Sequence, residues 1–225
     1  MIVRKIVPTA DNSKTLLIPG LNETYHSTHG AVQEGKHVFI EHGLAYIKNT
    51  PIIEIFEMGF GTGLNALLSL EFAVDHKLNI HYTSIEKFPL STEIIDKLGY
   101  GRLLDPEKFE HAYTQMHTTS PSQNSIIHQR FSLEKIEGDI LNIDLPPDKF
   151  DIVYYDAFGP KTQAELWEEE PLRKMYNCLK QGGILVTYCA QGQFKRNLKA
   201  VGFEVESLPG PPGKREMTRA RKRQN

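Results

Sequence analysis

Short apolar runs alternate along the chain with longer segments whose apolar residues recur at helical spacing. The strand-like runs are Ile52–Glu57, Ile80–Ile85, Leu133–Glu137, Phe150–Tyr155, Ile184–Tyr188 and Phe203–Leu208. The spacing predicts helices over 64–74, 91–98, 165–180 and 194–200, the third closed by Gly182 and Gly183. Alternating strands and helices are typical of an α/β fold, so we expect a doubly wound, mostly parallel sheet with its last strand near an edge.

The beginning and the end of the chain depart from this alternation. Residues 1–50 predict a small N-terminal extension, either a cap over the ligand site or an added β layer as Val38–Ile40 suggests. Residues 51–225 then hold the main domain and end in a basic tail, 214–225, while 99–132 give only irregular helices or loops. The length of 225 residues suits one domain with an appendage.

Composition excludes several classes of protein. With 40% hydrophobic and 24% charged residues, the chain is neither disordered nor collagen-like. Two cysteines are too few for a disulfide scaffold, and the four early histidines are irregularly spaced, so we expect no metal. The chain starts without a signal peptide and contains no run of transmembrane length, which predicts a cytoplasmic protein without membrane contact.

The formal net charge of −2 averages two unlike parts of the chain. Residues 214–225 carry a net charge of +5, and the remaining residues carry −7. Lys and Arg concentrated in this way suit contacts with phosphate groups, and a tail that only aids solubility is the alternative.

A glycine-rich segment, Glu57–Gly63, lies between the first predicted strand and its helix. Gly59, Gly61 and Gly63 let the backbone turn sharply and approach a ligand without a Cβ. Such a turn lies at the carboxyl ends of the strands, where ligands bind in doubly wound sheets. The third glycine follows the second by two positions instead of three, which weakens a nicotinamide or flavin interpretation, and no P-loop lysine follows.

Acidic residues follow four of the predicted strands. Glu57 would repel a pyrophosphate but attract a cation, such as the amino or sulfonium group of S-adenosylmethionine. Glu86 is placed to accept two ribose hydroxyls, as it also would be in a dinucleotide enzyme, and Asp139 is placed to accept an adenine amino group. Asp156 ends the fourth strand, where a carboxylate suits either a reaction centre or a turn.

Together these residues resemble the class I S-adenosylmethionine-dependent methyltransferases, which have a Rossmann-like fold. More narrowly, the chain resembles the methyltransferase of tRNA 5-methylaminomethyl-2-thiouridine biosynthesis, a family found alone or fused to an FAD-dependent oxidase. The glycine motif is common to the superfamily, whereas the N-terminal and C-terminal segments make the narrower match specific. The matching segments run in order from about residue 20 to 220: Glu23–Ser27, Gly30, Ala31, Glu34, His37–Ile40, Glu57–Asn65, Asp156–Phe158, Pro160, Glu165–Trp167, Tyr188–Ala190 and Gly210–Met217.

The resemblance implies methyl transfer from S-adenosylmethionine to the primary amine of 5-aminomethyl-(2-thio)uridine at the wobble position, in the anticodon loop of tRNA. It also implies the standalone form, with a separate enzyme supplying the aminomethyl precursor. The implied site residues are Asp156 for catalysis; Tyr25, Glu57, Gly59, Gly61, Gly63, Glu86 and Asp139 for the cofactor; and Phe158, Pro160, Lys214, Arg215 and Arg219 for the substrate.

Three other functions stay open at this point. They are a methyltransferase acting on a small-molecule amine, a nicotinamide-binding oxidoreductase and a non-catalytic RNA-binding module. Cutting the chain after Gly213 would favour the tRNA substrate if tRNA binding were lost, and the small-molecule substrate if it were unchanged.

Overall fold

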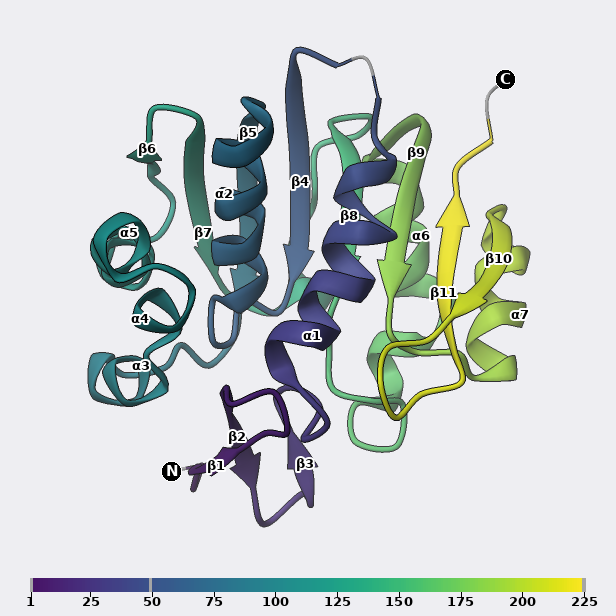
Figure 1. The fold of residues 1–225 in the computed structure, drawn as a ribbon. Helices are drawn as coiled ribbons and strands as arrows, with labels where there is room; N and C mark the ends of the chain where they lie inside the picture. Colours follow the sequence, from purple (N-terminus) through teal and green to yellow (C-terminus); the bar gives the residue numbers. More distant parts are fainter. Residues whose placement is uncertain (1, 49, 224–225) are drawn as a thin grey trace.

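The structure, a computed structural model, describes residues 2–48 and 50–223. An eight-stranded, mostly parallel sheet with helices on both faces forms its centre, which confirms the predicted fold class (Figure 1). The strands of this sheet are β4 (Ile52–Met58), β5 (Asn79–Glu86), β6 (Asn124–His128), β7 (Phe131–Glu137), β8 (Phe150–Tyr155), β9 (Leu179–Thr187), β10 (Glu204–Pro209) and β11 (Glu216–Arg221).

The order of the strands places a ligand crevice at the middle of the sheet. The order is β10-β11-β9-β8-β4-β5-β7-β6, and the five strands from β9 to β7 are parallel. β4 pairs with β5 on one side and with β8 on the other, so the order of the strands reverses at this point. Ligands of open α/β sheets bind outside the carboxyl ends of the strands at such a reversal.

Two apolar cores cover the two faces of the sheet. In β8, Ile152 and Tyr154 belong to one core, whereas Val153 and Tyr155 belong to the other, so a continuous apolar strand is buried on both faces. The first core includes residues of α2 (Leu64–His76), α3 (Thr92–Leu98), α4 (Tyr100–Leu104) and α5 (Pro106–Thr118), and the second includes residues of α6 (Glu169–Cys178) and α7 (Gly192–Val201). Short 3-10 turns span Leu44–Tyr46, Ile140–Asn142 and Ala164–Trp167.

The N-terminal extension is a small antiparallel sheet followed by a helix. Its strands are β1 (Lys5–Pro8), β2 (Lys14–Ile18) and β3 (Glu23–Thr24), which lie at the carboxyl end of the central sheet (Figure 1). The helix consists of α1 (Ala31–Gly35) and a π-helical turn, Lys36–Glu41. The β prediction for Val38–Ile40 is therefore wrong, because these apolar residues are the buried side of a helix that packs on α2.

The predicted basic tail is also wrong, because Glu216–Arg221 form β11 inside the sheet. This strand pairs with β10 on one side and with β9 on the other. Met217, Thr218 and Ala220 are fully buried, and basic side chains occupy other positions of the strand. The sequence does not reveal this strand, because its three buried residues alternate irregularly with basic ones.

The helix predicted over 165–180 is shorter than expected. α6 ends at Cys178, and Gly182 and Gly183 lie within β9 instead of closing the helix. These glycines accompany an irregularity in the pairing of β9 with β8, and Lys222 hydrogen-bonds to both of them through its backbone. Across the described helices, none combines the length and apolar character needed to cross a membrane.

Cutting the chain after Gly213 is expected to unfold the protein, and so does not test RNA binding alone. The cut removes β11, so backbone N–H and C=O groups of β9 and β10 lose their hydrogen-bond partners. It also removes Met217 from the first apolar core. Circular dichroism and thermal denaturation would check this expectation. A truncated chain that melts cooperatively at the temperature of the full chain would contradict it.

Candidate active site

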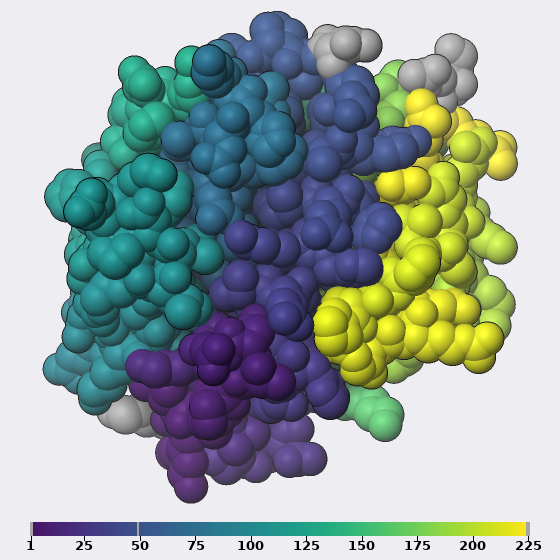
Figure 2. All heavy atoms as spheres, in the orientation of Figure 1, coloured from purple at the N-terminus to yellow at the C-terminus, as the bar shows by residue number. Residues whose placement is uncertain are grey.

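A cavity of about 1100 Å³ opens at the carboxyl ends of the central strands. Its walls come from the glycine turn after β4, from the segments that follow β5, β7, β8 and β9, from the N-terminal extension and from the loop before β11. The loop before β11 meets the N-terminal extension beside this region, where Gly213 lies against His29 and Lys214 pairs with Glu34, and Figure 2 shows the yellow segment against the purple-blue one. The volume exceeds the range of about 300–1,000 Å³ for a drug-sized ligand, so the cavity has room for a cofactor and part of a substrate.

The glycine turn has the backbone geometry that the sequence predicts. Gly59, Gly61 and Gly63 have φ angles of 93°, 47° and 70°. A Cβ on Gly61 would lie 3.2 Å from the ring of Tyr25, so only glycine lets this ring approach the turn without displacement. Gly59 and Gly61 line the cavity, whereas Gly63 precedes α2 and faces His117.

Glu86 and Asp139 both reach the cavity from neighbouring strand ends. Glu86 accepts hydrogen bonds from the backbone N–H groups of Gly61, at 2.9 Å, and Phe88, at 2.7 Å, which fix its carboxylate. Asp139 accepts from Leu141 N–H and pairs with Lys87 at 2.8 Å, and this hydrogen bond from Lys87 lowers the pKa of Asp139. Both carboxylates retain acceptor capacity for ligand hydroxyl or amino groups.

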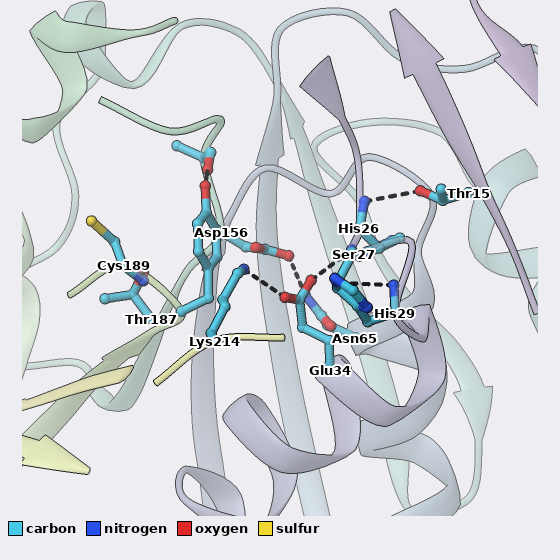
Figure 3. Close-up of polar contacts among 12 residues, drawn as sticks. Thr15, His26, Ser27, His29, Glu34, Asn65, Asp156, Thr187, Cys189 and Lys214 are labelled. Atoms are coloured by element: carbon cyan, nitrogen blue, oxygen red, sulfur yellow. Dashed lines mark hydrogen bonds and ion pairs between the residues drawn. The ribbon is translucent and has the colours of Figure 1, made fainter. Parts of the chain in front are cut away.

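Asp156 lies in the cavity wall directly after β8, and Asn65 of α2 holds its carboxylate. Asn65 Nδ2 donates to Oδ2 of Asp156 at 2.8 Å (Figure 3). It also donates to Oε1 of Glu57 at 3.1 Å. Glu57 is 0% exposed and accepts a second hydrogen bond from Ser84 at 2.8 Å. Glu57 therefore supports Asp156 through Asn65 from behind the wall, and the structure does not place it in the cavity itself.

Asp156 and Glu57 are weaker acids than exposed carboxyl groups. Burial raises the pKa of Asp156 to about 7, and repulsion from Glu34 acts in the same direction. The hydrogen bond from Asn65 and the Lys214 ammonium oppose this rise. Burial also raises the pKa of Glu57 well above its usual range. A carboxyl group that titrates near pH 7 is suited to accept and release protons.

Two aromatic rings face each other beside Asp156. Tyr25 and Phe158 are 5.1 Å apart in an edge-to-face arrangement, and the Tyr25 hydroxyl accepts from Arg4 Nε at 3.0 Å. Phe158 is fixed by its backbone, which accepts from Trp167 Nε1 at 2.9 Å, and Pro160 follows in the same wall. These rings offer an apolar surface for a planar group next to the carboxylate.

The three basic residues that the resemblance assigns to the substrate have different surroundings. Lys214 lies in the cavity wall and pairs with Glu34 at 2.6 Å, and Arg215 is exposed at the same wall. Arg219 lies away from the cavity, where it pairs with Glu206 at 2.6 Å and lies over the ring of Tyr46. Of these three, Arg215 is the exposed cation at the cavity.

Sequence reasoning assigned no role to Asn65, Glu34, Tyr188 or His26, all of which line the cavity. The Tyr188 hydroxyl donates a hydrogen bond to the Ala157 carbonyl at 2.7 Å, and His26 Nε2 is hydrogen-bonded to the Thr62 hydroxyl at 2.6 Å. All four residues lie in segments that resemble the family, yet no local pattern indicates which side chains of those segments turn inward. Asn65 directly follows the glycine turn, and that position was the available signal.

A family model described as "S-adenosyl-L-methionine-dependent methyltransferase" matches residues 106–223. The chain belongs to this family. The chain is also similar over its whole length to the solved structure of MNMC2 from Aquifex aeolicus, with a TM-score of 0.81 and 28% identity, covering 72% of that chain. Spermidine synthase from Thermotoga maritima, at a TM-score of 0.53 and 13% identity, shares the fold alone.

Two curated relatives extend the similarity. The tRNA 5-methylaminomethyl-2-thiouridine biosynthesis bifunctional protein MnmC of Cupriavidus metallidurans is 31% identical, over 95% of this chain and 33% of that protein. The protein of the same name from Leptospira interrogans is 30% identical, over 93% and 34% respectively. The chain thus spans about a third of the length of these relatives.

The cavity fits the cofactor of this family. Gly59 and Gly61 form a cradle in which backbone without a Cβ lines the cavity and can approach a ligand closely, and Glu86 stands at the neighbouring strand end where it can accept ribose hydroxyls. Carboxylates predominate in this wall, which suits a cation. The excess of acidic over basic side chains in the lining disfavours a pyrophosphate-containing nicotinamide cofactor, in agreement with the family.

Replacing Glu86 with glutamine is expected to weaken binding of S-adenosylmethionine about tenfold. The amide loses one acceptor and turns an NH₂ group towards a backbone N–H of Gly61 or Phe88, which costs about 1.5 kcal/mol. Isothermal titration calorimetry would measure the change. Glu93→Gln, an exposed glutamate of α3, is the control, and equal affinity of the two variants would contradict the role of Glu86.

Proposed function

We propose that the protein transfers a methyl group from S-adenosylmethionine to the primary amine of 5-aminomethyl-(2-thio)uridine at the wobble position of tRNA. The observation that carries this proposal is the Asp156 carboxylate, which Asn65 holds in a cavity wall beside two aromatic rings. The names of the two bifunctional relatives support the choice of substrate.

The cofactor residues divide the cavity between binding and reaction. Gly59 and Gly61 would hold the methionine part, Glu86 the ribose and Asp139 the adenine. When bound, S-adenosylmethionine supplies an electrophilic methyl group on a sulfonium. Asp156 follows β8 next to Gly59 and lines the same cavity as the aromatic rings, where a substrate amine would arrive.

The residues around the amine would act on its proton. A primary amine is largely protonated at neutral pH, and only its neutral form has the lone pair needed for attack on carbon. Asp156 would accept that proton and orient the nitrogen, while alignment of the reactants lowers the barrier further. Tyr25 and Phe158 would pack against the base, which is accessible because the wobble nucleotide lies in a single-stranded loop.

Arg215 would contact phosphate groups of the anticodon stem-loop, since it is exposed at the cavity wall. The reaction takes the aminomethyl form of the base, so a reaction that produces this amine must precede it.

The proposal is tested with methyl-labelled S-adenosylmethionine and tRNA from cells that lack the activity. Nucleoside analysis is expected to find label in 5-methylaminomethyl-(2-thio)uridine. The same tRNA from competent cells is the control, because its amine is already methylated. Absence of label from this nucleoside would overturn the proposal, and label in a polyamine under the same conditions would favour a small-molecule substrate.

A further inference from the structure

Lys214 is held inside the cavity wall by two neighbours. Its Nζ lies 2.6 Å from Oε2 of Glu34 and 3.8 Å from the centre of the Tyr188 ring. The side chain of Glu34 is only 8% exposed, and its other oxygen accepts from the backbone N–H of Ser27 at 2.9 Å. An ammonium held by a buried carboxylate and an aromatic ring is poorly placed to contact a phosphate at the surface.

The loop before β11 is shaped to direct Lys214 inward. Gly213 has a φ of 84°, and a Cβ at this position would overlap the ring of His29 in the N-terminal extension. Lys214 N–H donates to the Pro211 carbonyl at 2.9 Å, and Gly210 N–H donates to the Arg215 carbonyl at 3.1 Å. The loop therefore lies against the N-terminal extension, where Glu34 receives the ammonium.

Lys214 and Glu34 both lie beside Asp156, where Figure 3 shows them with Asn65 around its carboxylate. Each element packed around this carboxylate contributes a polar or titratable group. These groups are Glu57 from β4, Tyr82 from β5, Asn65 from α2, Glu34 from α1, Tyr188 from the segment after β9 and Lys214 from the loop before β11.

We propose that Glu34 and Lys214 are positioning residues that together set the protonation of Asp156. The Lys214 ammonium favours the ionised carboxylate, whereas the Glu34 carboxylate opposes ionisation and also anchors the ammonium. The pair thereby fixes the pH range in which Asp156 accepts a proton. The consequence for catalysis rests on the proposed function, but the titration of Asp156 does not depend on any substrate.

The test is a ¹³C NMR titration of the full chain labelled at the aspartate carboxyl carbons, with no cofactor or tRNA. The Asp156 resonance is the one that disappears in Asp156→Asn. Lys214→Met is expected to raise the titration midpoint by about one pH unit, and Glu34→Gln is expected to lower it by about as much. Lys214→Arg keeps the charge and should stay near the wild-type midpoint. Lys199→Met, which removes an exposed charge of α7, is the matched control.

Opposite shifts of the Asp156 midpoint in Lys214→Met and Glu34→Gln support the proposed roles of the two residues. The acid limb of the pH–rate profile for methylation should shift in the same directions. Midpoints that stay unchanged, or that move in the same direction, overturn the proposal. A loss of tRNA affinity in Lys214→Met without a shift would likewise overturn it and make Lys214 a phosphate contact. If Lys214→Met does not fold, Glu34→Gln decides alone, because its amide oxygen can still accept from Ser27. Failure of tRNA methylation would leave this titration measurable.

Discussion

Asp156→Asn is expected to lower the rate of methyl transfer by about 10²–10⁴-fold. The amide is isosteric and still accepts the hydrogen bond from Asn65, but it cannot take a proton from the substrate amine. Because the cofactor contacts are assigned to Gly59, Gly61, Glu86 and Asp139 and not to the Asp156 side chain, the affinity for S-adenosylmethionine should change little. Single-turnover methylation with saturating cofactor measures the first effect, and calorimetry measures the second.

A matched control for this variant lies in the same strand. Asp151 is at the other end of β8, where it pairs with Lys180 at 2.9 Å, so Asp151→Asn removes a carboxylate far from the cavity. Its turnover should equal that of the wild type, even if its melting temperature falls. Turnover of Asp156→Asn at the control's level would remove Asp156 from the mechanism.

Gly61→Val is expected to weaken binding of S-adenosylmethionine about 100-fold. A β-branched residue at a φ of 47° is strained by about 1–3 kcal/mol, and its Cβ would lie 3.2 Å from the Tyr25 ring. Relief of this strain moves either the turn or Tyr25. Each movement disturbs the cradle and the hydrogen bond that the backbone N–H of residue 61 donates to Glu86. Calorimetry at several temperatures would measure the affinity.

Gly20→Val provides the comparison for Gly61→Val. A Cβ on Gly20 meets no atom within 4 Å, so the same substitution there tests the effect of a valine without crowding. Cofactor affinity of this control should match the wild type. If both variants bind the cofactor equally well, the geometry of the glycine turn does not limit binding.

The local patterns predicted the part of the fold that surrounds the glycine turn. β4, the turn and α2 are consecutive in the chain, and each has its own signal: β-rich alternation, three glycines and strong helix formers. The carboxylates Glu86, Asp139 and Asp156 follow strands, so parallel pairing alone was enough to expect them at one edge. Such predictions succeed because backbone preference and burial act over a few residues.

Other parts depended on contacts between distant residues. β11 has a basic polar side and is a strand because β9 and β10 supply partners on both sides. Glu57 precedes the glycines as predicted, yet packing around Asn65 and Ser84 places it behind the wall. Lys214 belongs to a basic sequence, but the fold brings it to Glu34, which is 180 positions away.

The sequence by itself therefore determined the α/β fold, the glycine turn and the set of acidic residues at the strand ends, since these follow from local periodicity and chain order. The tertiary structure alone decided which charges face the cavity and how strongly Asp156 holds its proton. The physical reason is that the pKa of a carboxyl group depends on burial and on charges within a few ångströms. Those neighbours come here from both ends of the chain.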